Sequence, residues 1–228
     1  MLSDAAFYRQ WILANGWAEA VGLGTTFAIG GALAPLLDRN PSILVILAGA
    51  LAAVLLGTFL EGVLIGVAQA AVIRKRLSDL RPRTWIIATA VGAGLAWLLG
   101  MVPSTAMALQ SLGSDASPPS EPSAMVQYIM AAALGLVAGP ILGLAQWTVL
   151  RRHVPHAIRW LWANALAWAI GMPLIFLGMD HMPWTARPVV LLVAIYALCG
   201  ATGLVVGAVH GRVLVGLTQS RVATSSAV

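Results

Sequence analysis

The residue best suited to take part in chemistry is a glutamate, Glu61. It lies in the middle of an apolar stretch from residue 43 to 73. An ionisable side chain at mid-membrane commonly relays protons or pairs with a ligand. Two structural explanations stand beside that one. A protonated carboxyl can bond to a helix backbone, and a carboxylate can reach a wet outer cavity. Ala138 and Thr202 occupy the equivalent positions of two related segments, so no role common to all three segments requires Glu61.

Those segments share the pattern G-x-x-x-G-x-x-[Q/H]-x-x-V-[I/L], which occurs three times. Its polar position is filled by Gln69, Gln146 and His210. In a helix, the two glycines and the polar residue lie on one face. Glycines let a neighbouring helix approach closely, and an interhelical hydrogen bond in a membrane contributes about 0.6–2 kcal/mol. The pattern therefore predicts helix packing.

The alternate spans carry a second polar position, with a tryptophan shortly before it. Each such residue falls at about the depth of one of the glutamine or histidine positions, near one end of the spans. We define the polar layer by these six residues: Glu19, Gln69, Thr89, Gln146, Asn164 and His210.

Two interpretations of the polar layer are open. In the first, the side chains are interhelical contacts, with Gln69 near Glu19, Gln146 near Thr89 and His210 near Asn164. In the second, they surround a central site with non-identical donors. His210 adds a further option, because an intramembrane histidine can ligate haem or a chlorophyll-type pigment. We favour a histidine satisfied by packing, because a single intramembrane histidine among four is weak evidence for a ligand.

Composition excludes an ordinary soluble domain. The chain is 60% hydrophobic and 9% charged, whereas soluble proteins are about 25% charged. Apolar runs reach the roughly 20 residues needed to span a bilayer, so we expect an all-α integral membrane bundle. The expected spans cover residues 17–37, 43–73, 85–102, 125–150, 160–177 and 189–215.

The remaining segments are expected outside the membrane. Residues 1–16 favour an interfacial helix that ends at Asn15–Gly16, and residues 217–228 form a polar tail. Residues 111–123 are rich in serine and proline, which is typical of a flexible loop. The six-span domain is therefore expected over residues 17–216.

The cations fix the expected topology. Eleven of the thirteen lysines and arginines lie on the side of the two termini, and only Arg39 and Arg187 lie opposite. The positive-inside rule then predicts cytoplasmic termini in a bacterial-type inner membrane. Five of these cations are candidates for anionic lipid head groups: Arg74, Lys75, Arg76, Arg151 and Arg152.

The repeated patterns predict three helical hairpins, over residues 17–76, 85–152 and 160–215. Parallel copies imply pseudo-threefold symmetry about the membrane normal, as in some transporters. The segment G-x-x-x-G-x-A-Q-W-x-V-L-R-R-H-x-P, residues 139–155, resembles one in a group of uncharacterised bacterial multi-pass membrane proteins. In that group the segment recurs within a chain, and similar blocks accompany signalling domains.

The resemblance covers Trp17 to Leu214 and implies no particular activity. The third copy departs from the motif, with His210 for glutamine and Val215 for arginine. The sequence carries no nucleophile elbow, H-E-x-x-H helix or phosphate-binding loop, so an enzyme is the least supported class. We expect a non-enzymatic protein that packs against other membrane subunits or binds a small apolar or pigment-like ligand. The alternative is a small proton-coupled transporter or channel that uses Glu61 and the polar layer.

Overall fold

The protein is described here by a computed structural model that covers residues 2–39, 41–112 and 122–225. Every regular element in this part is helical, as the sequence predicts, and six helical segments are long and apolar enough to cross a membrane. The second of these segments contains three elements, α2, the π-helical η1 and α3. The elements are α1 (Asp4–Arg39), α2 (Ile43–Leu56), η1 (Gly57–Gly62), α3 (Val63–Ile73), α4 (Pro82–Ser111), α5 (Ala124–Leu150), α6 (Arg159–Asp180) and α7 (Pro188–Ser225).

Local sequence explains where several helices begin. Ser42 caps α2, with its Oγ accepting a hydrogen bond from the Val45 amide over 3.3 Å. Such a bond satisfies one of the amides that lack a partner in the first turn. Pro82 stands at the start of α4, where a missing amide hydrogen costs nothing.

Two expected boundaries are wrong. Helix α1 does not end at Asn15–Gly16 but continues through both residues. The Asn15 amide donates to the Trp11 carbonyl over 2.7 Å, and Gly16 packs against the Leu204 side chain of α7. The pair therefore serves helix packing. Similarly, α7 continues past Val215 to Ser225. Most of the expected serine- and proline-rich loop, residues 113–121, lies outside the described residues.

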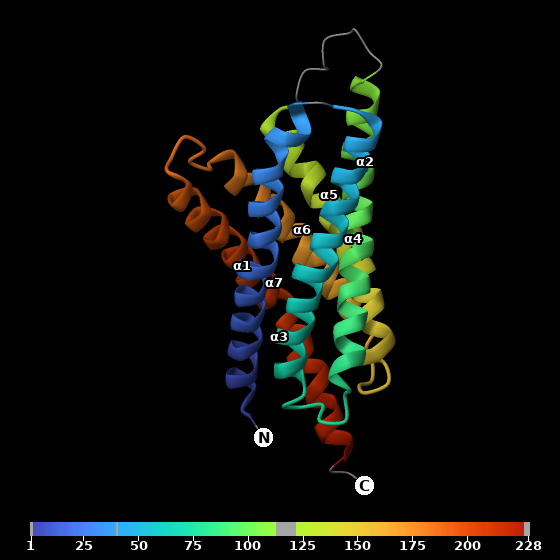
Figure 1. Cartoon of the computed structure of the whole chain (residues 1–228). Coiled ribbons are helices and arrows are strands. Elements are labelled where there is room, and N and C mark those ends of the chain that lie inside the picture. Colours follow the sequence, from blue (N-terminus) through green and yellow to red (C-terminus); the bar gives the residue numbers. More distant parts are fainter. Residues whose placement is uncertain (1, 40, 113–121, 226–228) are drawn as a thin grey trace.

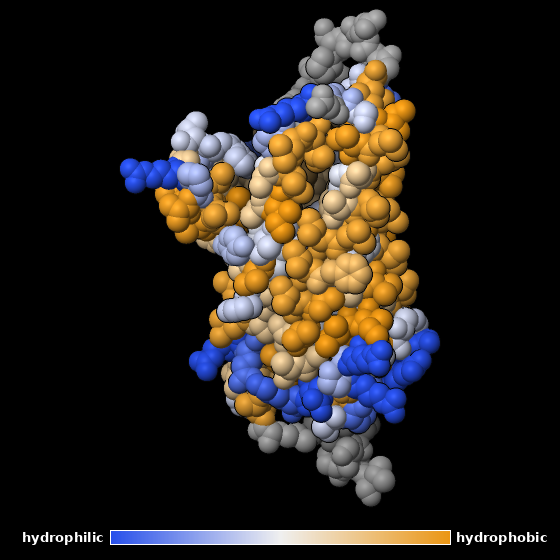
Figure 2. Space-filling view, viewed as in Figure 1, coloured by the Kyte–Doolittle hydropathy of each residue, from blue (hydrophilic) through white to orange (hydrophobic). Residues whose placement is uncertain are grey.

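The six spans pack in sequence order, and α7 closes the bundle against α1. Figure 1 shows the long helices side by side, with both ends of the chain at the same end of the bundle. The first half of α7 leans outward from the other helices (Figure 1). Figure 2 shows an apolar band across the middle of the face in view, with hydrophilic residues gathered toward the ends.

Glycines bring particular helices into close contact. A Cβ added to Gly66 of α3 would lie 2.9 Å from the Ile86 Cα of α4. Likewise, a Cβ at Gly207 of α7 would lie 3.2 Å from the Ile12 Cα of α1. Gly143 of α5 faces α6 in the same way. Each glycine-rich helix thus packs on the helix that follows it around the bundle, and α7 packs on α1.

An apolar core closes the end of the bundle that holds the termini. The loop after α3 inserts Leu77 and Leu80, and the loop after α5 inserts Val154 and Ala157. These loops lie beyond the spans, so the hydrophobic effect favours burial of their side chains. Burying a leucine stabilises the fold by roughly 1.5–3 kcal/mol. Trp85 packs in the same cluster and links it to the polar residues described next.

Candidate functional site

A buried hydrogen-bond network joins the helices above this apolar core. Gln69 of α3 lies at its centre and donates from Nε2 to Asn15 Oδ1 over 2.8 Å. Gln69 Oε1 accepts from Trp85 Nε1 over 3.2 Å and from Gln146 Nε2 over 2.9 Å. One side chain thereby connects α1, α4 and α5.

Gln146 extends the network. Its Nε2 also donates to Thr89 Oγ1 over 2.9 Å, and its Oε1 accepts from Trp160 Nε1 over 2.9 Å. Trp11 completes a third contact of the same kind, since its Nε1 donates to His210 Nδ1 over 2.9 Å. Three indoles therefore donate to the three polar positions of the glycine-rich helices.

The residue four positions after each of these tryptophans is also polar. Asn15, Thr89 and Asn164 donate to the carbonyls of Trp11, Trp85 and Trp160, at 2.7, 2.9 and 2.9 Å respectively. The first position in this series is thus Asn15 and not Glu19. We call these contacts, together with those of the glutamines and His210, the tryptophan–amide network. Its members are Trp11, Asn15, Gln69, Trp85, Thr89, Gln146, Trp160, Asn164 and His210.

Of the three expected contacts in the polar layer, the one between Gln146 and Thr89 is confirmed. The expected pairing of Gln69 with Glu19 is wrong, because Asn15 takes that place. His210 pairs with Trp11 and not with Asn164. Both errors follow from the register of α1, in which Asn15, one turn before Glu19, faces the network.

His210 is a packing residue in this arrangement. It is 2% exposed, and its ring centroid lies 5.1 Å from that of Trp160. Because Nδ1 accepts from Trp11, the proton of a neutral imidazole lies on Nε2. A nitrogen must be free of its proton to ligate a metal, so haem or pigment ligation does not fit this contact. The described residues hold no cluster of three metal-ligating side chains.

Glu61 and Glu19 meet further into the bundle. Both are buried, at 4% and 1% exposed, and their carboxyl groups are near enough to interact electrostatically. A Cβ on Gly22 would lie 2.7 Å from the Glu61 Cα, so the backbones of α1 and η1 touch here. Trp97 Nε1 donates to Glu61 Oε2 over 2.8 Å, while Glu19 Oε2 has no hydrogen-bond partner. Glu19 therefore belongs with Glu61 and not with the polar layer.

Helix α7 supplies the other side of this carboxyl pair. Gly203 lies against Glu19, since an added Cβ would come within 2.6 Å of the Glu19 Cβ. The neighbouring Thr202 is buried and its Oγ1 has no partner. Cys199, one turn earlier, is buried as well and lies within electrostatic reach of both glutamates. The residues that α7 contributes on this side are therefore uncharged.

A cavity of about 260 Å³ opens beside Glu61. Helices α1, α4, α5 and α6 and the segment η1 enclose it, and its wall is otherwise apolar. Sequence reasoning found Glu61 but missed Trp97, because nothing in the spacing shows that the two residues meet. The lining residues are Leu23, Phe27, Glu61, Ala93, Ala96, Trp97, Gly100, Met101, Leu134, Ala138, Leu142, Trp168, Met172, Ile175 and Phe176.

A larger groove of about 800 Å³ adjoins this cavity. It lies between α1, α2 and the outward-leaning start of α7, and its lining is almost wholly apolar. Phe27 and Trp97 line both spaces and pack edge to face, with ring centroids 6.4 Å apart. These two rings therefore lie where the cavity and the groove border each other.

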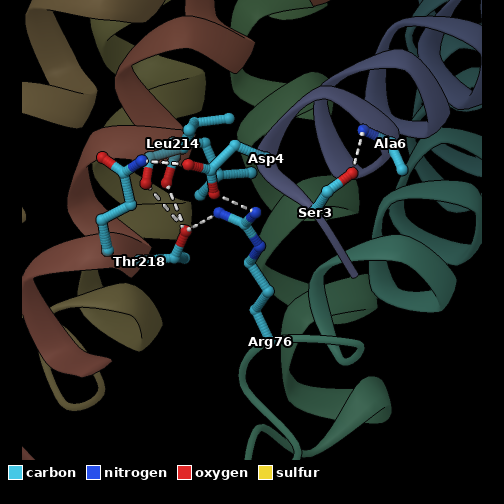
Figure 3. Close-up of polar contacts among 8 residues, drawn as sticks. Ser3, Asp4, Ala6, Arg76, Leu214 and Thr218 are labelled. Carbon is cyan, nitrogen blue, oxygen red and sulfur yellow. Dashed lines mark hydrogen bonds and ion pairs between the residues drawn. The ribbon is translucent and has the colours of Figure 1, made fainter. Parts of the chain in front are cut away.

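The five candidate lipid-binding cations lie at the end with the termini, but they differ in role. Arg76 pairs with Asp4 and donates to Thr218 Oγ1 over 3.0 Å, which ties α1 to α7 (Figure 3). Lys75 Nζ donates to Gln10 Oε1 over 2.6 Å. Arg151 lies over the Trp147 ring. Arg76 is engaged in the fold, whereas Arg74, Lys75, Arg151 and Arg152 are exposed.

Comparison with known proteins adds no assignment. No protein-family model, curated protein or solved structure matches the chain. Function is therefore argued from the carboxyl pair, the cavity and the tryptophan–amide network.

Proposed function

We propose that this protein is a non-enzymatic, membrane-embedded binder of a small, largely apolar ligand, held in the cavity beside Glu61. The observation that carries the proposal is the cavity itself. Side chains from five elements line this space of about 260 Å³, which is partly open to the outside of the bundle. Ligand sites combine apolar walls with a few placed polar groups, as this cavity does with Glu61 and the Trp97 indole.

The bundle is filled at the end with the termini and hollow on the side of the apolar groove, and this difference supports the same function. The tryptophan–amide network and the apolar core fill the bundle at the end with the termini. On the other side, the cavity adjoins the apolar groove, and Phe27 and Trp97 line both spaces. A ligand that partitions into lipid reaches the cavity by displacing these two rings.

The membrane and the repeat belong to the proposal too. Thirteen cations distributed eleven to two support cytoplasmic termini in a bacterial-type inner membrane. Three indole contacts, to Gln69, Gln146 and His210, support three hairpin units about a pseudo-threefold axis. In that arrangement Trp11 and Asn15 open the first unit. Four exposed cations, Arg74, Lys75, Arg151 and Arg152, contact anionic head groups.

A small proton-coupled transporter is the second candidate. The observation in its favour is the buried pair of Glu19 and Glu61, in which Glu19 Oε2 lacks a partner. Buried carboxyls in spans commonly carry protons. Uptake in proteoliposomes under an imposed pH gradient distinguishes the candidates. If the protein is a transporter, Glu61→Gln should stop proton-coupled uptake. If it is a binder, neither the wild type nor Glu61→Gln should show coupled uptake.

Native mass spectrometry after gentle purification tests the binding function. Ala138 lines the cavity, so Ala138→Leu fills it, whereas Ala133→Leu adds the same volume to an exposed position of the same helix. We expect a small molecule to accompany the wild type and Ala133→Leu but not Ala138→Leu. Equal retention by both variants, or a bare wild-type chain, would contradict the proposal. A retained protein subunit would instead indicate a packing or assembly role.

A further inference from the structure

We infer that the ligand of this cavity carries a positive charge, and that it belongs to the lipophilic ammonium compounds, with a quaternary ammonium the best match. The inference rests on the proposed function, because it names the class of ligand for the same cavity. It stands on three features of the wall: the Glu61 carboxyl, the aromatic rings around it and the absence of any protein cation.

The aromatic rings are the first feature. Phe27, Trp97, Trp168 and Phe176 all line the cavity, and they come from three different helices. An aromatic face attracts a cation through its quadrupole, and cages of such rings recognise quaternary ammonium groups. The attraction grows when water is excluded, as it is within a bilayer. Rings from several directions match the shape of an ammonium surrounded by methyl groups.

The carboxyl group is the second feature. Trp97 occupies Glu61 Oε2, and no other hydrogen bond reaches this carboxyl within the described residues. Glu19 lies within electrostatic reach and has an oxygen without a partner. Two like charges in a low-dielectric interior repel strongly, so the pair favours a guest that brings positive charge. On α7, Cys199 lies within electrostatic reach of both glutamates, and its thiol is a neutral group.

The third feature is that the protein supplies no cation of its own here. Among the residues that the structure describes, no lysine, arginine or histidine lines the cavity. The ion pair Arg76–Asp4 and the contact between His153 and Asp79 lie at the end with the termini, away from the cavity. A buried carboxylate without a positively charged partner is energetically costly. An ammonium ligand removes that cost, and a neutral ligand of the same shape does not.

Two probes of equal shape test the inference. Benzyltrimethylammonium carries a permanent charge, and neopentylbenzene replaces its nitrogen with carbon. Calorimetric titration of the full chain in an uncharged detergent, corrected with empty micelles, gives both affinities. We expect the wild type to bind the ammonium at least about tenfold more tightly than the neutral probe. Glu61→Gln should remove this preference, so that the ammonium binds no more tightly than the neutral probe.

Two further variants keep the test independent of folding defects. Phe176→Leu keeps an apolar wall and should weaken ammonium binding about two- to fivefold. Asp180→Asn removes a carboxyl that bonds Tyr128 outside the cavity, and it should leave both affinities unchanged. Equal binding of both probes by the wild type would overturn the charge preference and leave the binding function standing. Binding of neither probe would overturn both.

Discussion

The indole Nε1 of Trp97 donates to Glu61 Oε2 over 2.8 Å, and this bond joins α4 to the π-helical segment η1 at the cavity wall. Single π-helical turns within α-helices frequently mark functional sites. Here the turn carries Glu61 in the middle of a span, with Glu19 beside it. The relationship fixes the orientation of the one carboxyl that lines the cavity.

Removal of the Trp97 indole donor should lower the stability of the fold by a measurable amount. Trp97→Phe keeps a ring in the wall but leaves the buried Glu61 carboxyl without its hydrogen bond. We expect a loss of about 1–3 kcal/mol in the free energy of unfolding, measured by thermal unfolding in detergent. Trp162→Phe changes a lipid-facing indole that is 73% exposed, so its effect should be small. Equal losses in both variants would mean that the bond to Glu61 contributes little.

Gln146 should contribute strongly to the stability that the tryptophan–amide network provides. Gln146→Leu strands the Trp160 indole and removes both bonds from Nε2, so we expect about 1–3 kcal/mol of destabilisation. Gln127→Leu is the matched control, since Gln127 lies at the exposed start of the same helix. Thermal unfolding of the two variants gives the comparison. A Gln146 variant as stable as its control would show that the network is not stabilising.

His210 tests whether the three indole contacts are equivalent. A glutamine there can accept from Trp11, as Gln69 and Gln146 accept from their own indoles. We therefore expect His210→Gln to unfold within about 1 kcal/mol of the wild type, and His210→Leu to lose about 1–3 kcal/mol. If His210→Gln is no more stable than His210→Leu, the contact of His210 with Trp11 is not equivalent to the two glutamine contacts.

Much of the architecture follows from the sequence, because spans depend on local composition. The fourth span was expected at Met125–Leu150 and is Ala124–Leu150. The glycine faces were also found correctly, since a period of 3.6 residues places Gly62, Gly66 and Gln69 together. The contact between Gln146 and Thr89 was expected because the two residues lie at similar depths in their spans.

The register of α1 could not be predicted in the same way. Asn15–Gly16 reads locally as a helix stop, and this interpretation moved the first polar position from Asn15 to Glu19. In the fold, contact with α7 overrides the local preference, because Gly16 lies against Leu204. The meeting of Glu19 with Glu61 depends on that register and on the π-helical turn, and neither is visible in residue spacing.

Close packing of α3 on α4 should not tolerate a methyl group. A Cβ at Gly66 meets the Ile86 backbone at 2.9 Å, and backbone cannot yield as a side-chain end can. We expect Gly66→Ala to cost about 1–3 kcal/mol, again by thermal unfolding. Gly100→Ala meets nothing within 4 Å and should be neutral or slightly stabilising, because alanine favours helix. The opposite order would refute the close contact.

The most direct test of the central claim is to locate an apolar probe in an experimental structure. Crystals of the full chain soaked with bromobenzene report the bromine position by anomalous scattering. The account predicts a bromine peak in the cavity bounded by Glu61, Trp97 and Trp168 in the wild type, and no peak there in Ala138→Leu. A cavity filled by rearranged side chains, or bromine found only on the outer surface, would contradict it.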